Sequence, residues 1–217
     1  MKLACAVFDM DGTIVDNMAY HVRAWLETSR RLGLSVAAEV FERDTAGMKN
    51  DEIIPWLLGR AVSREELDRI SLEKEEAYRR AYRPHLAPMP GFLAFLERLE
   101  RAGRRRALAT AAPPGNRDLV LGGLGLRFDA VIGAEHAARG KPAPDIYLAA
   151  AKALGVAPAE CVAFEDALNG VRSARAAGMD VVGIPTMVPG AALQEVGARW
   201  VMKDFTELPR DLEEALS

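Results

Sequence analysis

The sequence predicts an α/β protein in which helices cover a parallel sheet and a helical segment is inserted near the start. Two features of the pattern predict it. Six short apolar runs alternate with stretches in which apolar residues recur every three or four positions. From residue 17 to residue 86, by contrast, the pattern is almost entirely helical. Because strands that alternate with helices pair in parallel, with helices on both faces, the alternating part predicts a doubly wound core.

The predicted strands of this core are short and apolar, and helical stripes at residues 92–99 and 146–154 separate them. Glycines follow the expected helix ends, at Gly103, Gly155 and Gly178. This repeated order of strand and helix is that of a Rossmann-like fold. The six strands are expected at Leu3–Phe8, Arg105–Ala109, Ala130–Ile132, Cys161–Phe164, Val181–Ile184 and Trp200–Met202.

The inserted segment is predicted to form a separate α-helical subdomain. Three helices are expected in it, beginning near Asn17, near Asn50 and after Ser63, where Ser63 and Glu66 match a capping box. Prolines in the run RPHLAPMPG close the segment and suit a hinge. We therefore expect two domains, a Rossmann-like core at residues 1–16 and 87–217 and an inserted helical cap subdomain at residues 17–86.

The composition excludes several kinds of partner. With 217 residues the chain is long enough for a domain and a sizeable insertion, and its net charge is −3. A slightly negative charge gives no reason to expect nucleic acid or an anionic membrane as partner. No segment approaches the roughly 18 apolar residues of a membrane span. We expect a cytoplasmic monomer with neither nucleic acid nor membrane as partner.

The two cysteines, Cys5 and Cys161, both fall in predicted apolar strands. In a cytosolic protein, thiols in such positions are usually buried and reduced. We therefore expect two free thiols and no disulfide.

Two carboxylates, Asp9 and Asp11, directly follow the first predicted strand. Residues two apart on a strand point the same way, about 7 Å apart, and ligands bind at the carboxyl ends of parallel strands. Gly12 allows a sharp turn and a close approach of ligand to backbone. A calcium-binding loop of the EF-hand type is excluded, because such a loop needs a glutamate at its twelfth position, which is Tyr20 here. On their own, the two aspartates could equally be turn and helix-cap residues.

Other predicted strand ends also carry polar residues. Glu165 and Asp166 end the fourth strand, and Thr110 ends the second, before small residues beginning with Ala111 whose amides are accessible. Lys141 lies in a loop before a helix. If these ends converge, like charges about 4 Å apart repel by about 4 kcal/mol at an effective dielectric of about 20, so the carboxylates require a cation. Oxygen ligands indicate Mg²⁺, while a lysine beside a hydroxyl and an amide suits a phosphate.

Four motifs, in this order, resemble those of the haloacid dehalogenase superfamily on its phosphotransferase side. They are DMDGT at residues 9–13, Thr110, Lys141 in KPAPD, and Glu165–Asp166 in FEDALNGVRSARAAG. The resemblance covers the whole chain, and the inserted helical segment is similar to the small α-helical cap of this family. It implies that the core is the catalytic domain.

The resemblance also implies a mechanism. Asp9 would be the nucleophile that forms an aspartyl-phosphate, and Asp11 would protonate the leaving oxygen and then activate water. Thr110 and Lys141 would bind the transferring phosphoryl group. Anionic carboxylate attacks anionic phosphate only when cations screen both.

The metal implied by the resemblance is Mg²⁺. It would be held by the side chain of Asp9, the backbone carbonyl of Asp11 and the side chain of Asp166, with Glu165 close by or ligating.

Within the superfamily, the run NMAYHVRAW resembles the β-phosphoglucomutase subgroup, with His21 and Trp25 matching. Lys74 matches a cap lysine that contacts substrate. His21 would couple cap closure to Asp11, although a histidine satisfied within the first cap helix explains it too.

The chain also departs from the mutase pattern. That pattern has a lysine and an arginine that grips the non-transferring phosphate at two cap positions, where this chain has Ala46 and Asn50, and Lys49 would substitute in part. We therefore favour a phosphatase acting on a small phosphorylated metabolite such as a sugar phosphate. A β-phosphoglucomutase-type isomerase and a pyrophosphatase remain alternatives, while a non-enzymatic phosphate-binding module is disfavoured by the complete set of nucleophile, acid and metal ligands. The candidate substrate- and phosphate-binding residues are Gly12, Ala111, His21, Lys49, Asn50 and Lys74.

Overall fold

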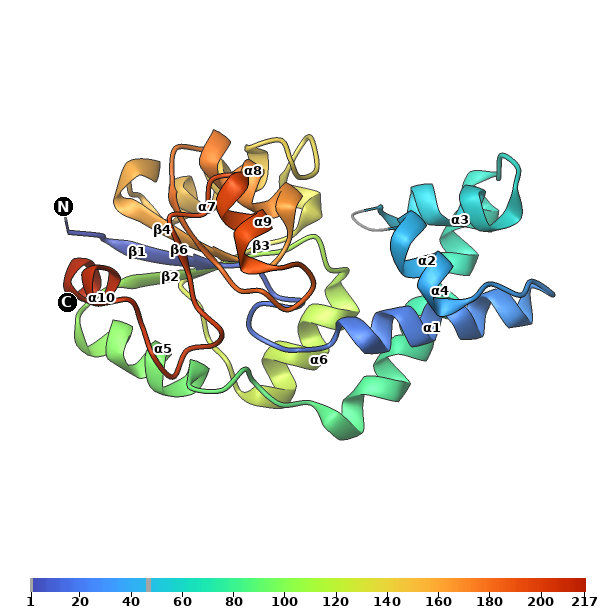
Figure 1. Ribbon diagram of the computed structural model, residues 1–217, viewed down its shortest axis with the longest axis horizontal. Helices are drawn as coiled ribbons and strands as arrows, with labels where there is room; N and C mark the ends of the chain where they lie inside the picture. Colours follow the sequence, from blue (N-terminus) through green and yellow to red (C-terminus); the bar gives the residue numbers. More distant parts are fainter. Residues whose placement is uncertain (1, 46–47) are drawn as a thin grey trace. The chain divides into compact units, whose positions relative to one another are not determined.

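The protein is described by a computed structural model that covers residues 2–45 and 48–217, without the side chains of residues 42 and 43. The prediction for Ala46 lies outside the described residues. The chain forms two compact units, one made of Met1–Asp16 with Ala87–Ser217 and the other of Asn17–Leu86 (Figure 1). We call them the core unit and the helical unit.

The core unit contains a six-stranded sheet in which all strands are parallel, which confirms the predicted doubly wound α/β fold. All six predicted strands are present, two with the predicted bounds and four with ends shifted by one or two residues. The strand order is β3-β2-β1-β4-β5-β6, so the chain builds the sheet outward from β1 first in one direction and then in the other. The crevice for a ligand in such a sheet lies where the order reverses, at the carboxyl ends of β1 and β4. The strands are β1 (Cys5–Phe8), β2 (Arg105–Ala109), β3 (Ala130–Ile132), β4 (Cys161–Glu165), β5 (Asp180–Gly183) and β6 (Trp200–Val201).

Helices cover both faces of this sheet. In the view of Figure 1, α7, α8 and α9 lie above the sheet, and α5 and α10 lie below it. The helices and short 3-10 turns are α5 (Phe92–Arg101), α6 (Pro114–Leu124), η2 (Ala134–His136), α7 (Asp145–Leu154), η3 (Pro158–Glu160), α8 (Leu168–Ala176), α9 (Gly190–Glu195) and α10 (Arg210–Leu216).

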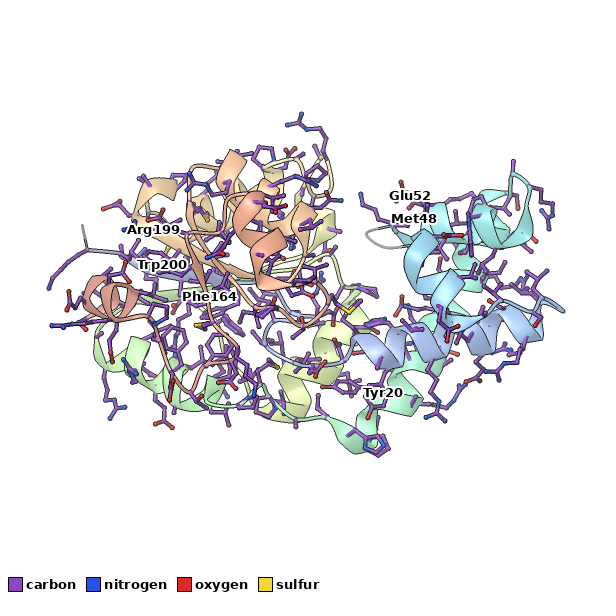
Figure 2. All side chains as sticks on the ribbon, in the orientation of Figure 1. Tyr20, Met48, Glu52, Phe164, Arg199 and Trp200 are labelled. Carbon is purple, nitrogen blue, oxygen red and sulfur yellow. A yellow bond between two sulfur atoms is a disulfide. The ribbon has the colours of Figure 1, made fainter. Side chains whose placement is uncertain are left out.

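The two faces of the sheet differ in side-chain size. Because successive residues of a strand point to opposite faces, Val7 and Ala163 lie on the face packed against α7 and α8, whereas Phe8 and Phe164 lie on the other. The rings of Phe8 and Phe164 stack with centroids 4.7 Å apart (Phe164 is labelled in Figure 2). Phe8 also packs edge-on against Phe92 of α5, at 5.3 Å. Small residues thus bring α7 and α8 close to the sheet, and aromatic rings fill the space on the opposite side.

The cysteine prediction is wrong, because Cys5 and Cys161 form a disulfide. The two residues lie directly opposite each other in the register of β1 and β4, with Cα atoms 4.8 Å apart. That separation lies within the range that a disulfide spans. Hydrophobic pattern places each cysteine in an apolar strand but does not show that the two strands are neighbours in register.

The helical unit contains four helices among its described residues, one more than expected. The additional helix, α2, carries few core residues, chiefly Phe41, so its apolar stripe is too short to be recognised from periodicity. The predicted cap is confirmed at Ser63, whose hydroxyl accepts from the backbone N–H of Glu66 at 3.2 Å. The elements are α1 (Met18–Arg31), α2 (Ala38–Thr45), α3 (Asn50–Leu58), α4 (Arg64–Tyr82) and the 3-10 turn η1 (Arg83–His85). Across residues 2–45 and 48–217, no helix has the length and apolar character needed to cross a membrane.

Candidate active site

The register of the central strands brings the predicted site residues to one edge of the sheet. Phe8 of β1 lies opposite Leu108 of β2 and Phe164 of β4. The residues one step further along are therefore neighbours, and the backbone N–H of Asp9 continues the ladder by donating to the carbonyl of Phe164 at 3.0 Å. Asp9, directly after β1, and Glu165, the last residue of β4, therefore lie at the same end of two adjacent strands.

Three carboxylates form a buried cluster at this edge. Asp9, Glu165 and Asp166 each offer an oxygen, and these oxygens all lie within 4.8 Å of one another. The residues are 8%, 1% and 4% exposed. Because the three carboxylates are close together and shielded from water, they repel one another strongly when ionised. Their oxygens are the ligands that a hard divalent cation prefers.

One cation of the chain, Lys141, lies against this cluster. Its Nζ donates to Asp9 Oδ1 and to Glu165 Oε1, at 2.6 Å each, and lies 3.3 Å from the carbonyl oxygen of Ala109. A single ammonium leaves the three carboxylates with an excess of negative charge. The donor set therefore fits a divalent cation.

The excess of negative charge in the cluster contributes to the raised pKa values of its carboxyl groups. Burial raises the pKa of Asp9 to about 7; Lys141 opposes the rise, and Glu165 and Asp11 add to it. Burial, followed by the charges of Glu165 and Asp9, raises the pKa of Asp166 well above its usual range. Burial lowers the pKa of Lys141, but Asp9 and Glu165 outweigh it and keep the pKa above its usual value. Lys141 is therefore a permanent cation, whereas the carboxylates need a further positive charge to be fully ionised.

Gly12 provides room for one of the carboxylates. Its φ is +72°, and a Cβ at this position would lie 2.1 Å from Asp166 Oδ2. Thr186, two residues after Ile184, lies with its hydroxyl oxygen 2.8 Å from the carbonyl oxygen of Gly12 and 3.3 Å from Asp166 Oδ2. The hydroxyl thus ties the turn after β1 to the carboxylate after β4.

Thr110 lies at the next strand end. It is buried, its N–H donates to the carbonyl of Ile132 at 3.0 Å, and its hydroxyl oxygen accepts from the N–H of Ala112 at 3.1 Å. Since that bond uses a lone pair, the hydroxyl proton is free to be donated elsewhere. Ala111, between the two, is exposed. Asp11 is half-buried, and its charge contributes to the raised pKa of Asp9.

The helical unit brings three of the other predicted residues together. Lys74, only 3% exposed, has its Nζ 2.9 Å from His21 Nδ1 and 2.9 Å from Glu75 Oε1. The same Glu75 oxygen accepts from the side-chain amide of Asn50 at 3.0 Å. Because an ammonium only donates, His21 Nδ1 must accept. Lys49, in contrast, is exposed, and its backbone N–H donates to Glu52 at the start of α3.

Sequence reasoning missed three residues of these networks. Thr186 follows a strand, so the strand-end argument applied to β5 could have found it. Tyr147 of α7 is fully buried and donates its hydroxyl to Glu165 Oε1 at 2.6 Å, but in the sequence it is one more apolar position of a helical stripe. Burial and then Glu165 raise the pKa of Tyr147 well above its usual value, so it stays a proton donor. Glu75 gave no signal, because in the sequence it is one of several charged residues in the run EKEE.

Comparisons with known proteins cover most of the chain. A family model described as haloacid dehalogenase-like hydrolase matches residues 3–178. Fructose-1-phosphate phosphatase YqaB of Escherichia coli (strain K12) is 36% identical over 190 residues, which are 84% of this chain and 97% of the relative. Beta-phosphoglucomutase of Bacillus subtilis (strain 168) is 29% identical over 221 residues, 97% of this chain and 93% of the relative. The crystal structure of a family IA, variant 3 HAD hydrolase from Entamoeba histolytica HM-1:IMSS has a TM-score of 0.90 at 27% identity, over 100% of this chain and 99% of the other.

Proposed function

The chain belongs to the haloacid dehalogenase-like hydrolase family, and we propose that it is a Mg²⁺-dependent phosphatase of a small, sugar-phosphate-like metabolite. One observation carries the proposal. The Asp9 carboxylate, at the end of a central strand, is held by Lys141 and crowded by Glu165 and Asp166. A nucleophile, a permanent cation and a cluster that fits a divalent cation are together what phosphoryl transfer through a carboxylate requires. The similarity to a fructose-1-phosphate phosphatase supports a sugar phosphate as the substrate.

In the proposed reaction, a carboxylate oxygen of Asp9 attacks phosphorus and the ester P–O bond breaks. Asp11 gives its proton to the leaving oxygen, and an aspartyl-phosphate remains on Asp9. Asp11, now ionised, takes a proton from water, which attacks phosphorus and releases inorganic phosphate and free Asp9. Lys141 and the hydroxyl of Thr110 bind the phosphoryl oxygens in both steps.

Asp9, Asp166 and the backbone carbonyl of Asp11 would hold the metal, with Glu165 beside them. When bound, a divalent cation offsets the negative charge of the carboxylates and of the phosphoryl group. The chain's own contribution is to hold Asp9 where Lys141 limits its rotation. Burial excludes bulk water from the cluster.

The test is phosphate release from a panel of phosphorylated metabolites, with and without Mg²⁺, by the wild-type protein and by Asp9→Asn. We expect turnover of at least one sugar phosphate that needs Mg²⁺ and is abolished by the substitution. Asp68→Asn is the matched control, because it makes the same chemical change at an exposed ion pair of α4. An Asp9→Asn protein as active as this control would refute the proposal.

A β-phosphoglucomutase-type isomerase is the second candidate, favoured by the similarity to the Bacillus subtilis enzyme and by the contact of Lys74 with His21. The phosphatase is preferred because Asn50 is neutral and already donates to Glu75, so it provides no cation for a second phosphate. Incubation with β-glucose 1-phosphate and a bisphosphate primer separates the two. Glucose 6-phosphate as product identifies a mutase, whereas inorganic phosphate identifies a phosphatase. Pyrophosphate belongs in the same panel, since a pyrophosphatase is the third candidate.

A further inference from the structure

Glu165 is the residue of the acidic cluster that the chain holds most tightly. It is 1% exposed, and its Oε1 accepts two bonds of 2.6 Å, one from Lys141 and one from the hydroxyl of Tyr147. Its Oε2 lies 3.4 Å from the backbone nitrogen of Ala167. Both oxygens therefore have partners within the core unit.

Gly170 of α8 closes the space around this carboxylate. A Cβ at position 170 would lie 2.0 Å from the carboxyl carbon of Glu165, closer than atoms can approach. Tyr147, Ala167 and Gly170 thus surround the carboxyl group of Glu165 and restrict its orientation. The carboxylate then has a fixed direction in which to hold a cation.

From this geometry we propose that Tyr147 is a positioning residue, which acts through Glu165 to fix the Lys141 ammonium against Asp9 Oδ1. The proposal rests on the proposed phosphatase function only in its kinetic consequence. Its structural part concerns contacts within the core unit.

The contacts of Lys141 explain why such a residue is needed. A lysine side chain has four flexible torsions, and its ammonium is a point charge without a preferred plane. Asp9 Oδ1, Glu165 Oε1 and the carbonyl of Ala109 surround the ammonium, and the ring of Tyr147 lies 5.2 Å from Nζ. Tyr147 thus acts on Lys141 twice, by orienting Glu165 and by offering an aromatic face to the charge.

The alternation of the strands accounts for this arrangement. Phe164 points to the aromatic face of the sheet, so Glu165 points to the opposite face, where α7 packs. Lys141 precedes α7 by one short loop, and Tyr147 lies in its first turn. The first turn of α7 and the loop before it therefore place the Tyr147 hydroxyl and the Lys141 ammonium against the same oxygen of Glu165.

Tyr147→Phe is the decisive variant, because it removes one hydroxyl and keeps the ring, the packing and the charge of the cluster. Tyr20→Phe, the same change in the helical unit, is its control. Gly170→Ala tests the packing around the Glu165 carboxyl group, and Gly122→Ala is its control, since a Cβ at position 122 of α6 meets no atom within 4 Å.

The first measurement needs neither metal nor substrate. In the metal-free protein, the ¹H–¹⁵N signal of the Lys141 ammonium, assigned by its loss in Lys141→Arg, reports how firmly the group is held. We expect slow hydrogen exchange in the wild type and in both controls, and exchange about tenfold faster in Tyr147→Phe, the size of effect expected from a hydrogen bond to a charged group. Unchanged exchange in Tyr147→Phe would overturn the proposal.

The second measurement is steady-state phosphate release. Tyr147→Phe should lower kcat about tenfold, with KM and the Mg²⁺ concentration for half-maximal activity changed less than about twofold. A higher Mg²⁺ requirement with unchanged kcat would overturn the proposal, because Tyr147 would then serve the metal ligands instead. If exchange accelerates as expected but the wild type hydrolyses no phosphoester, the positioning contact stands and the phosphatase function fails. Should Gly170→Ala not fold, Tyr147→Phe alone decides.

Discussion

Each unit of the chain holds a lysine against carboxylates, and the surroundings of the two lysines differ in charge balance. Lys141 of the core unit faces Asp9 and Glu165 directly, with Asp166 in the same cluster. Lys74 of the helical unit pairs with one carboxylate, that of Glu75. The first site has more negative than positive charge, while the second pair is neutral.

The surroundings of Lys74 complete its pairing. His21 accepts from the ammonium, Asn50 donates to Glu75, and the Trp25 ring lies 5.3 Å from the ammonium. A buried charge is tolerated when it is paired and hydrogen-bonded, and this one is. The two lysines therefore differ in what their surroundings can accept. The excess of carboxylates around Lys141 fits a further cation, whereas the charge of Lys74 is already balanced by Glu75.

The largest expected effect is the loss of phosphatase activity when Lys141 is replaced. Lys141→Met should lower kcat/KM for phosphate release about a thousandfold, because it removes the cation that faces Asp9, the proposed nucleophile. The measurement is steady-state phosphate release at saturating Mg²⁺. A loss of less than tenfold would show that Lys141 stabilises the carboxylate cluster without serving the reaction.

The next largest effect is a loss of folding stability when Lys74 is replaced. Lys74→Met removes the cation that faces the buried Glu75 carboxylate, which should lower the free energy of unfolding by about 3 kcal/mol. Urea unfolding followed by circular dichroism measures it. Arg64→Ala, which breaks an exposed pair with Asp68 in the same helix, is the control and should change stability by less than about 1 kcal/mol. Equal effects of the two substitutions would contradict the importance of the buried pair.

A third variant tests how closely the core carboxylates are packed. Gly12→Ala places a Cβ against Asp166 Oδ2 at a backbone φ of +72°, so activity should fall about a hundredfold and the Mg²⁺ requirement should rise. Gly33→Ala is matched to it, because Gly33 has a φ of +77° with no atom near the added carbon. Both variants incur the backbone strain of about 1–2 kcal/mol, and only the first displaces the carboxylate. Similar activities of the two would mean that strain alone matters.

The smallest effect concerns pH. A folded-state pKa of about 7 for Asp9, against an ordinary value of 3.8, means that the folded protein binds the extra proton between these values. The stability of the metal-free protein should therefore fall as pH rises through this window, by about 2 kcal/mol between pH 5 and pH 6.5 from Asp9 alone. Urea unfolding in the presence of a chelator measures it, and Asp9→Asn should remove that part of the slope. An identical pH dependence in the variant would show that Asp9 is ionised throughout.

Much of the core site follows from sequence, because strand ends are readable from it. Asp9, Thr110, Lys141 and Glu165 are predicted to converge. The parallel register of β2, β1 and β4 brings Asp9, Thr110 and Glu165 to one end of the sheet, and Lys141 reaches Asp9 and Glu165 from the loop before α7. Tyr147 was not predicted, since the position of a hydroxyl on an apolar helix depends on how that helix packs.

Pairing between distant segments was the main source of error. The bond between Cys5 and Cys161 depends on β1 and β4 being neighbours in register, and hydrophobic periodicity does not give strand order. The contact of Asn50 with Glu75 likewise joins two helices whose packing the sequence does not specify. The charge balance that distinguishes the two lysines is therefore a property of the fold, although each lysine could be singled out from the sequence.

The room reserved at Gly12 and Gly170 has a consequence for mutational tolerance. Neither glycine has a side chain to offer a substrate, yet each marks the space occupied by a carboxyl group, of Asp166 and of Glu165 respectively. Every other amino acid adds at least a methyl group where an oxygen or a carboxyl carbon already lies. In a saturation scan scored by turnover, both positions should accept glycine alone, because any side chain would overlap a carboxyl group. Their sensitivity to substitution should then be as high as that of the proposed catalytic residues.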